Sequence, residues 1–218
     1  MVRTITVKGV GSVSAKADYV VISMTVDSVS KYYDKAMEVA GERVKNLQDT
    51  IVSLGYTKED LKTVGFEVDT KYKSVKDKND NYKKVFVGYT CEYRLKFGFD
   101  FDKKQLAKVV TAIGESEANP EFDIRFTIKD PSKVSQELLV SATENARSKA
   151  EILCLASGCR LGQLISIDYN WGELEVFSRA KYDLIECYSL GSKPNSAPEI
   201  EPDDIETSDS ATFIWEIH

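Results

Sequence analysis

The residue types that usually carry catalysis or bind metals are few in this chain and lie far apart. The only histidine is His218, the last residue, so no imidazole base stands near a serine or cysteine nucleophile. The four cysteines, Cys91, Cys154, Cys159 and Cys187, match neither the spacing of a zinc knuckle nor a disulfide framework. We therefore predict plain thiols, no catalytic residue, no metal site, no cofactor and no enzymatic activity.

Two short motifs resemble ligand-binding loops, but each lacks a residue that the ligand requires. Gly9-Val-Gly11 begins like a dinucleotide fingerprint, yet Ser14 takes the place of the third glycine and no helix follows. We interpret these glycines as a bulge or a close backbone approach within a strand. Residues 77–81 imitate the start of a calcium loop, but Tyr82 stands where the loop needs glycine.

The most distinctive chemistry is a run of lysines interleaved with tyrosines near residues 71–84. Lysines can bind phosphates and tyrosines can stack on bases, which is how single-stranded nucleic acid is often held. Interspersed aspartates, the lack of arginine in the run and a net charge of -6 for the whole chain weigh against nucleic acid. We interpret the run as a solvated hairpin or a subunit contact. The candidate interaction surface comprises Lys71, Tyr72, Lys73, Lys76, Lys78, Tyr82, Lys83 and Lys84.

The apolar pattern around these lysines predicts the element that carries them. Residues 63–75 and 83–99 alternate as two long strands with a polar, turn-rich segment between them. They predict a β-hairpin whose tip projects into solvent. We expect its apolar face, including Val85, Val87 and Tyr89, to pack on a helix.

Two long helices are predicted, over about 32–54 and 131–157, with a shorter one over 102–114. Asp130 before a proline is a strong start signal for the second long helix, and Gly158 fits its end. This helix has a stripe of small residues that would let it approach a sheet closely. The stripe comprises Leu138, Ala142, Ala146, Ala150 and either Leu153 or Cys154.

The remaining strand patterns predict an α+β protein with mainly antiparallel sheets covered by two long helices. Residues 191–210 contain three prolines and a cluster of acids and indicate an acidic loop. The first two strands are expected to be joined by a turn near residues 15–18. The strand patterns cover 3–13, 18–29, 122–129, 163–170 and 211–217, with one or two short strands within 174–190.

We expect one domain, 1–218, with two lobes. Both end strands are apolar enough to need a sheet, so the termini should share a lobe made of 1–64 plus 131–218. Residues 65–130 would form an inserted lobe of hairpin, helix and strand.

Charge is divided unevenly along the chain. Residues 1–109 hold 20 basic and 15 acidic residues, whereas 110–218 hold 9 and 20. If the halves map onto different faces, a head-to-tail contact between copies brings opposite potentials together. The hairpin would then be the positive arm and the acidic segment 199–209 its partner surface. Two independent solvated loops are the alternative.

Two segments resemble the signatures of the SIMPL-domain (YggE-like) family, whose function is unknown. One is Ile5-Thr-Val-Lys-Gly-Val-Gly-Ser-Val-Ser-Ala-Lys-Ala-Asp18, although Ala17 stands where the family often has proline. The other is Ala142-Thr-Glu-Asn-Ala-Arg-Ser-Lys-Ala-Glu151 with its continuation to Leu161-Gly162. The resemblance covers nearly the whole chain. It implies an α+β fold, often treated as two lobes, and self-association, with no agreed catalytic residues.

Location and function follow from these patterns as expectations. No apolar run is long enough for a membrane helix and the N-terminus alternates like a strand, so we expect a soluble protein without a signal peptide. As the chain stands this predicts a cytoplasmic protein; exported or periplasmic is expected if a leader was removed, since many bacterial family members are exported. We expect a non-enzymatic homo-oligomer that serves as a scaffold or binding surface. A peptide- or nucleic-acid-binding module that uses hairpin 71–84 and an enzyme with a pocket between the lobes are the alternatives.

Overall fold

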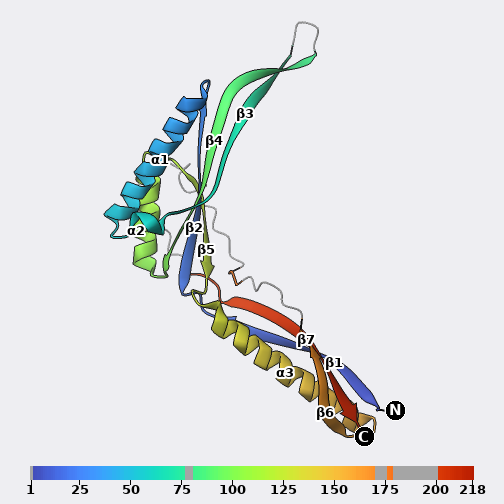
Figure 1. The fold of residues 1–218 in the computed structure, drawn as a ribbon. Helices are drawn as coiled ribbons and strands as arrows, with labels where there is room; N and C mark the ends of the chain where they lie inside the picture. Colours follow the sequence, from blue (N-terminus) through green and yellow to red (C-terminus); the bar gives the residue numbers. More distant parts are fainter. Residues whose placement is uncertain (1, 77–80, 170–175, 179–200) are drawn as a thin grey trace. The chain divides into compact units, whose positions relative to one another are not determined.

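The computed structural model describes residues 2–76, 81–169, 176–178 and 201–218 (Figure 1). The α+β class with antiparallel sheets is confirmed. The described helices are α1 (Tyr33–Ser53), α2 (Lys103–Glu115) and α3 (Pro131–Ala156), with a short 3-10 helix, η1 (Lys58–Asp60). The strands are β1 (Thr4–Ala15), β2 (Tyr19–Ser30), β3 (Lys62–Lys76), β4 (Tyr82–Asp100), β5 (Glu121–Thr127), β6 (Leu161–Asp168) and β7 (Ile205–Ile217).

The chain folds into two compact units, which we describe separately. Unit 1 contains the described residues of 1–18, 127–179 and 202–218, and unit 2 contains those of 19–126 and 180–201. In unit 1 the first and last strands pair in antiparallel fashion along the whole of β1, as we expected for the termini.

The unit boundaries differ from the expected lobes of 1–64 plus 131–218 and of 65–130. Strand β2 pairs with β4 from Tyr19 opposite Asp100 to Ser30 opposite Tyr89. Residues 19–64 therefore group with the hairpin and not with the termini. The turn expected near residues 15–18 does not make a hairpin, because β1 and β2 belong to different sheets. Asp18 instead accepts a hydrogen bond from the Lys129 backbone N–H at 2.7 Å.

Unit 2 is a four-stranded antiparallel sheet in the order β3-β4-β2-β5, with α1 and α2 on one face (Figure 1). Alternate residues of β2, such as Ile22 and Met24, are buried in its core, as the strand period of two requires. Local signals mark the ends of these two helices. Gly55 has a φ of +95° just beyond α1, and the Asp102 side chain accepts from the Gln105 N–H at the start of α2.

Unit 1 is a three-stranded sheet in the order β1-β7-β6, and α3 packs on β1 and β7. The predicted stripe of Ala142, Ala146 and Ala150 is buried. The stripe needs small residues because α3 lies directly against the backbone of two glycines in β1. A Cβ on Gly9 would overlap the Ala142 carbonyl oxygen, and one on Gly11 would overlap the Leu138 carbonyl oxygen. The predicted close backbone approach is therefore confirmed.

Polar side chains on α3 also hydrogen-bond to backbone groups at the outer edge of β1. Three of them, four residues apart on the helix, hydrogen-bond to the backbone of alternate β1 residues. Four helical residues rise about 6 Å and two strand residues about 6.6 Å. Every fourth α3 side chain therefore lies beside every second β1 residue. The pairs are Lys149 Nζ with the Lys8 carbonyl (3.3 Å), Asn145 Oδ1 with the Val10 N–H (3.1 Å) and Ser141 Oγ with the Ser12 N–H (3.4 Å).

The predicted acidic loop over 191–210 is wrong in its last third. Strand β7 begins at Ile205, which is 1% exposed and lies opposite Ala15, so residues 205–210 are strand. Their polar sequence has little strand propensity, and pairing with β1 overrides it. Residues 191–200 and most of the segment 174–190 lie outside the described residues.

The start of α3 gives a pH-dependent prediction. The Asp130 carboxylate accepts from both the hydroxyl and the backbone N–H of Ser132, at 2.6 and 3.0 Å, and these bonds lower the pKa of Asp130. Because the folded-state pKa is depressed, this stabilisation is present above the unfolded pKa and is lost as pH falls through the folded pKa. We expect Asp130→Ala to lower the urea midpoint at pH 7, and to do so less at pH 2.5. Asp130→Asn keeps an acceptor but cannot ionise, so it should lose only the pH-dependent part. An equal effect of Asp130→Ala at both pH values would contradict this account.

Candidate interaction surface

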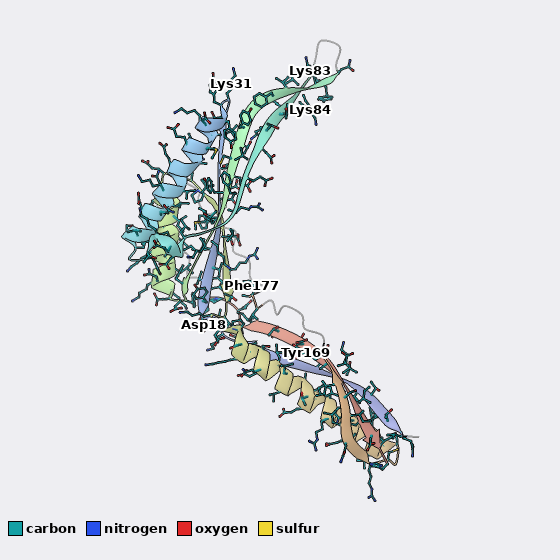
Figure 2. The ribbon with its side chains drawn as sticks, viewed as in Figure 1. Asp18, Lys31, Lys83, Lys84, Tyr169 and Phe177 are labelled. Atoms are coloured by element: carbon teal, nitrogen blue, oxygen red, sulfur yellow. The ribbon has the colours of Figure 1, made fainter. Side chains whose placement is uncertain are left out.

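The hairpin that bears the predicted surface extends beyond the rest of its sheet. Strand β2 ends at Ser30, opposite Tyr89, and past this point β3 and β4 continue with no third strand from the described part of the chain. We call residues 71–76 and 82–88 the ribbon. Lys83 and Lys84 lie on this extension, past Lys31 at the end of β2 (Figure 2). A two-stranded hairpin without other support is only marginally stable in water.

The strand register divides the predicted surface between two faces of the ribbon. Residues opposite one another share a face, and neighbours along a strand alternate. The pairs Tyr72–Phe86, Ser74–Lys84 and Lys76–Tyr82 therefore lie on one face, and Lys73–Val85 and Val75–Lys83 on the other. Of the predicted residues, Tyr72, Lys76, Tyr82 and Lys84 share the first face, Lys71, Lys73 and Lys83 share the second, and Lys78 lies outside the described residues.

An aromatic row follows the first face from the core of unit 2 onto the ribbon. Tyr89 packs beside the buried cluster under α1 and meets the edge of Tyr33 at 5.7 Å between ring centroids. Phe86 lies 5.4 Å from Tyr89, and Tyr72 lies 5.7 Å from Phe86. Their near-perpendicular planes are the edge-to-face geometry that aromatic pairs prefer. The two outer rings are exposed to solvent, with Tyr72 55% and Phe86 41% exposed.

The prediction that Val85 and Val87 pack on a helix is wrong. Both side chains are exposed, at 45% and 41%. Helix α1 begins at Tyr33, close to the end of β2, and covers only the part of β4 that includes Tyr89 and Cys91. Val87 is also the unpaired residue of a β-bulge, because Lys71 lies opposite Gly88 while Tyr72 lies opposite Phe86. The ribbon therefore shows apolar side chains on both faces.

The ribbon carries a concentrated positive charge. Residues 71–84 contain six lysines and two aspartates. Within the described part of the chain, no salt bridge joins Lys71, Lys73, Lys83 or Lys84 to an acidic group. The Lys76 ammonium lies 5.7 Å from the centre of the Tyr82 ring, in cation–π range.

The acidic segment 199–209 has a different structure from the loop that was predicted. Its first two residues lie outside the described residues, and Glu201 forms a salt bridge with Lys103 at 3.0 Å. Asp209 accepts a 2.7 Å hydrogen bond from the Tyr169 hydroxyl, which raises the pKa of Tyr169. Three acids remain exposed before and within β7, namely Asp203, Asp204 and Glu206.

The family of the chain follows from comparison with known proteins. A family model described as SIMPL, a protein of unknown function (DUF541), matches residues 5–215. The chain belongs to the SIMPL family. This SIMPL chain is also 28% identical over 166 residues to the 26 kDa periplasmic immunogenic protein of Brucella abortus (strain S19). A protein of the same description from Brucella melitensis biotype 1 matches equally, at 28% over 166 residues. In each case the match covers 75% of this chain and 65% of the relative's length.

The other chemistry-bearing groups of this SIMPL chain are dispersed. Among the described residues, no three histidine, cysteine or acidic side chains converge as a metal site would require. Cys91 and Cys154 are buried free thiols, Cys159 is half-buried and free, and Cys187 lies outside the described residues. Burial raises the pKa of Cys91, which disfavours a reactive thiolate. No helix in the described ranges is long and apolar enough to cross a membrane. The candidate interaction surface is therefore the feature from which we argue function.

Proposed function

We propose that this SIMPL chain is a non-enzymatic protein that assembles with copies of itself, and that the ribbon is the arm that makes the contact. One observation carries the proposal: the ribbon extends past β2 as two strands with exposed aromatic and aliphatic side chains on both faces. Burying such side chains against a second copy removes apolar surface from water at roughly 25 cal/mol per Å². The contact would also supply the support that a two-stranded ribbon lacks.

Charge favours a head-to-tail contact. Two ribbons brought together would place lysines against lysines, whereas the second half of the chain holds 9 basic and 20 acidic residues. A contact between different surfaces of two copies is heterologous, and such contacts close into rings when the rotation allows. The resulting assembly would serve as a scaffold or present a repeated binding surface to another protein.

The aromatic row provides the test of self-association. We expect wild-type protein to show a mass by light scattering of at least twice the 24.4 kDa of one chain, and this mass to fall in 1 M salt, where the Debye length is about 3 Å. The Tyr72→Ser/Phe86→Ser variant should have the mass of one chain at concentrations where wild type is assembled. Tyr32→Ser is the matched control, because Tyr32 is also an exposed tyrosine, 67% exposed, but lies off the ribbon. A wild-type protein of single-chain mass would overturn the proposal, and an unchanged assembly after the double substitution or after deletion of 76–81 would exclude the ribbon as the arm.

A peptide- or nucleic-acid-binding module is a second candidate. The observation that favours it is the presence of Lys76 and Lys84 on the same ribbon face as Tyr72 and Tyr82. Nucleic-acid binding would show an affinity for a single-stranded oligonucleotide that falls steeply with salt. Self-association without such binding favours the first function. An enzyme with a pocket between the lobes also stays a prediction, and turnover of a substrate would establish it.

We also propose an exported location. The support is the name of the two Brucella relatives, which describes those proteins as periplasmic. Fractionation of cells that express the chain from its own gene tests this. Recovery with cytoplasmic markers would instead favour the cytoplasmic location that the sequence predicted.

A further inference from the structure

The turn that ends helix α3 brings two cysteines together. The backbone N–H of Cys159 donates to the Cys154 carbonyl at 2.9 Å, and that of Gly158 donates to the Leu155 carbonyl at 3.2 Å. With Gly158 at a φ of +70°, these two bonds make the Schellman motif that ends many helices. The first and sixth residues of this motif often make a side-chain contact across the turn. Here both of those residues are cysteines, and both are free thiols.

The hydrogen bond between the two cysteines limits how far apart their Cα atoms can lie. With an N···O distance of 2.9 Å, standard backbone bond lengths and angles allow no more than about 6.8 Å between the Cα atoms of Cys154 and Cys159. Disulfides join cysteines whose Cα atoms are roughly 4.4–6.8 Å apart. The backbone of the turn therefore already holds the two residues within the range that a disulfide requires.

Both sulfurs lie on the side of the turn that faces the sheet of unit 1. Cys154 continues the buried alanine stripe of α3 at the same four-residue spacing, so its side chain is directed toward the sheet. The Cys159 sulfur accepts from the Arg3 guanidinium at 3.9 Å, and Arg3 immediately precedes β1. The Cys159 thiol also donates to the Ser157 carbonyl at 3.7 Å, a weak contact that rotation about the Cα–Cβ bond would give up.

The burial of the cysteines sets the order in which they can react. Cys159 is half-buried, so a small reagent can reach its sulfur. Cys154 is only 3% exposed, and a reagent reaches it through Cys159. Cys91 is buried in unit 2 under α1, and burial raises the pKa of its thiol, which disfavours the reactive thiolate. Exchange with a disulfide reagent therefore begins at Cys159.

We infer that Cys154 and Cys159 form a disulfide under oxidising conditions, which fastens the end of α3 to the chain that enters β6. The Cys159 thiolate attacks a small-molecule disulfide, releases one thiol and leaves a mixed disulfide. The Cys154 thiolate then attacks the Cys159 sulfur and releases the second thiol, while each cysteine gives its proton to water. Two cysteines are oxidised and one small disulfide is reduced to two thiols. Disulfides persist in oxidising compartments such as the periplasm, which matches the exported location that we propose.

Peptide mapping of the whole chain, first reduced and then incubated with oxidised glutathione, tests the bond. Trypsin cleaves after Lys149 and Arg160, so residues 150–160 form one peptide that contains both cysteines. We expect mass spectrometry without reductant to find this peptide mainly in a form that is lighter by two hydrogen atoms and does not react with iodoacetamide. Glutathione retained on Cys159, a link to Cys187, or uptake of two alkyl groups by this peptide as the main product would each overturn the inference.

Single substitutions provide the controls. Cys154→Ser should leave glutathione on Cys159, and Cys91→Ser should give the same oxidised peptide as the wild type. A crosslink restricts the unfolded chain, so oxidation should raise the urea midpoint of unit 1, followed by Trp215 fluorescence, in wild type and Cys91→Ser but not in Cys159→Ser. Equal midpoints for oxidised and reduced wild type would show that the bond does not fasten α3. A wild-type protein of single-chain mass would overturn the proposed self-association and leave this inference standing.

Discussion

Substitution of Gly11 by valine is expected to lower the free energy of unfolding of unit 1 by about 3 kcal/mol or more, at the upper end of the usual cost of overpacking. A Cβ at this position overlaps the Leu138 carbonyl oxygen and lies 2.9 Å from the Ala142 backbone nitrogen. Both atoms belong to the backbone of α3, so no side-chain rotation relieves the overlap. Helix and sheet must separate, which uncovers the buried side chains Phe213 and Trp215.

Urea unfolding followed by tryptophan fluorescence measures this effect, because Trp215 lies in the core of unit 1. Gly41→Ala, inside α1 of unit 2, is the matched control: beyond the backbone of its own helix, no atom lies within 4 Å of a Cβ built on Gly41. Alanine is favoured over glycine in a helix by about 1 kcal/mol, so the control should not lower the fluorescence midpoint, and circular dichroism should show unit 2 stabilised. Equal urea midpoints for Gly11→Val and wild type would show that α3 does not approach β1 as described.

The second large effect is expected from Ala146→Leu, which should cost on the order of 1–3 kcal/mol. Ala146 is fully buried, and its Cβ lies 2.7 Å from the position that a Cβ on Gly9 would take. Three further carbons therefore have no space between α3 and β1. Thermal unfolding measures the loss, and Ser148→Leu, at an exposed position of the same helix, is the control. An unchanged melting temperature for Ala146→Leu would mean that the alanine stripe faces solvent.

The helices and their ends could be predicted because their signals are local. The Asp130 cap, the proline that follows it and the positive φ of Gly158 all depend on residues close in sequence. The alanine stripe was also visible, since a period near four identifies the buried face of a helix. The glycines on the opposite strand indicated a close approach, but only the structure shows that the two features meet.

The division into units depends on strand pairing between distant segments, and the observed units differ there from the lobes that we expected. The strand patterns 3–13 and 18–29 were expected to be joined by a turn, whereas β2 pairs with β4 more than 50 residues later. The short connection between β1 and β2 crosses from one unit to the other instead. There the Asp18 backbone N–H donates to the Thr127 carbonyl, and the Asp18 carboxylate accepts the Lys129 backbone N–H. No local pattern distinguishes this crossing from a turn.

For the candidate interaction surface, the sequence predicted the hairpin that carries these residues but not their arrangement on it. Composition placed lysines and tyrosines on a hairpin, whereas the bulge near Lys71 and the register decide which of them share a face. The strand at residues 205–208 was missed because these residues resemble a loop in composition. Their strand character follows from β1, nearly 200 residues earlier in the chain.

The place of β7 in its sheet has a consequence for the order in which the protein can fold during synthesis. It is the central strand of unit 1, between β1 and β6, and Thr4 of β1 lies opposite Glu216. The described helices and strands of unit 2 lie within 19–127, so that unit can fold while β7 has not yet emerged. Strand β1 and the alanine face of α3 must wait for β7, with Val7 and the stripe uncovered until then. We expect the chain to be most vulnerable to aggregation and to need chaperones most in that interval, and unit 1 to form only once β7 is available.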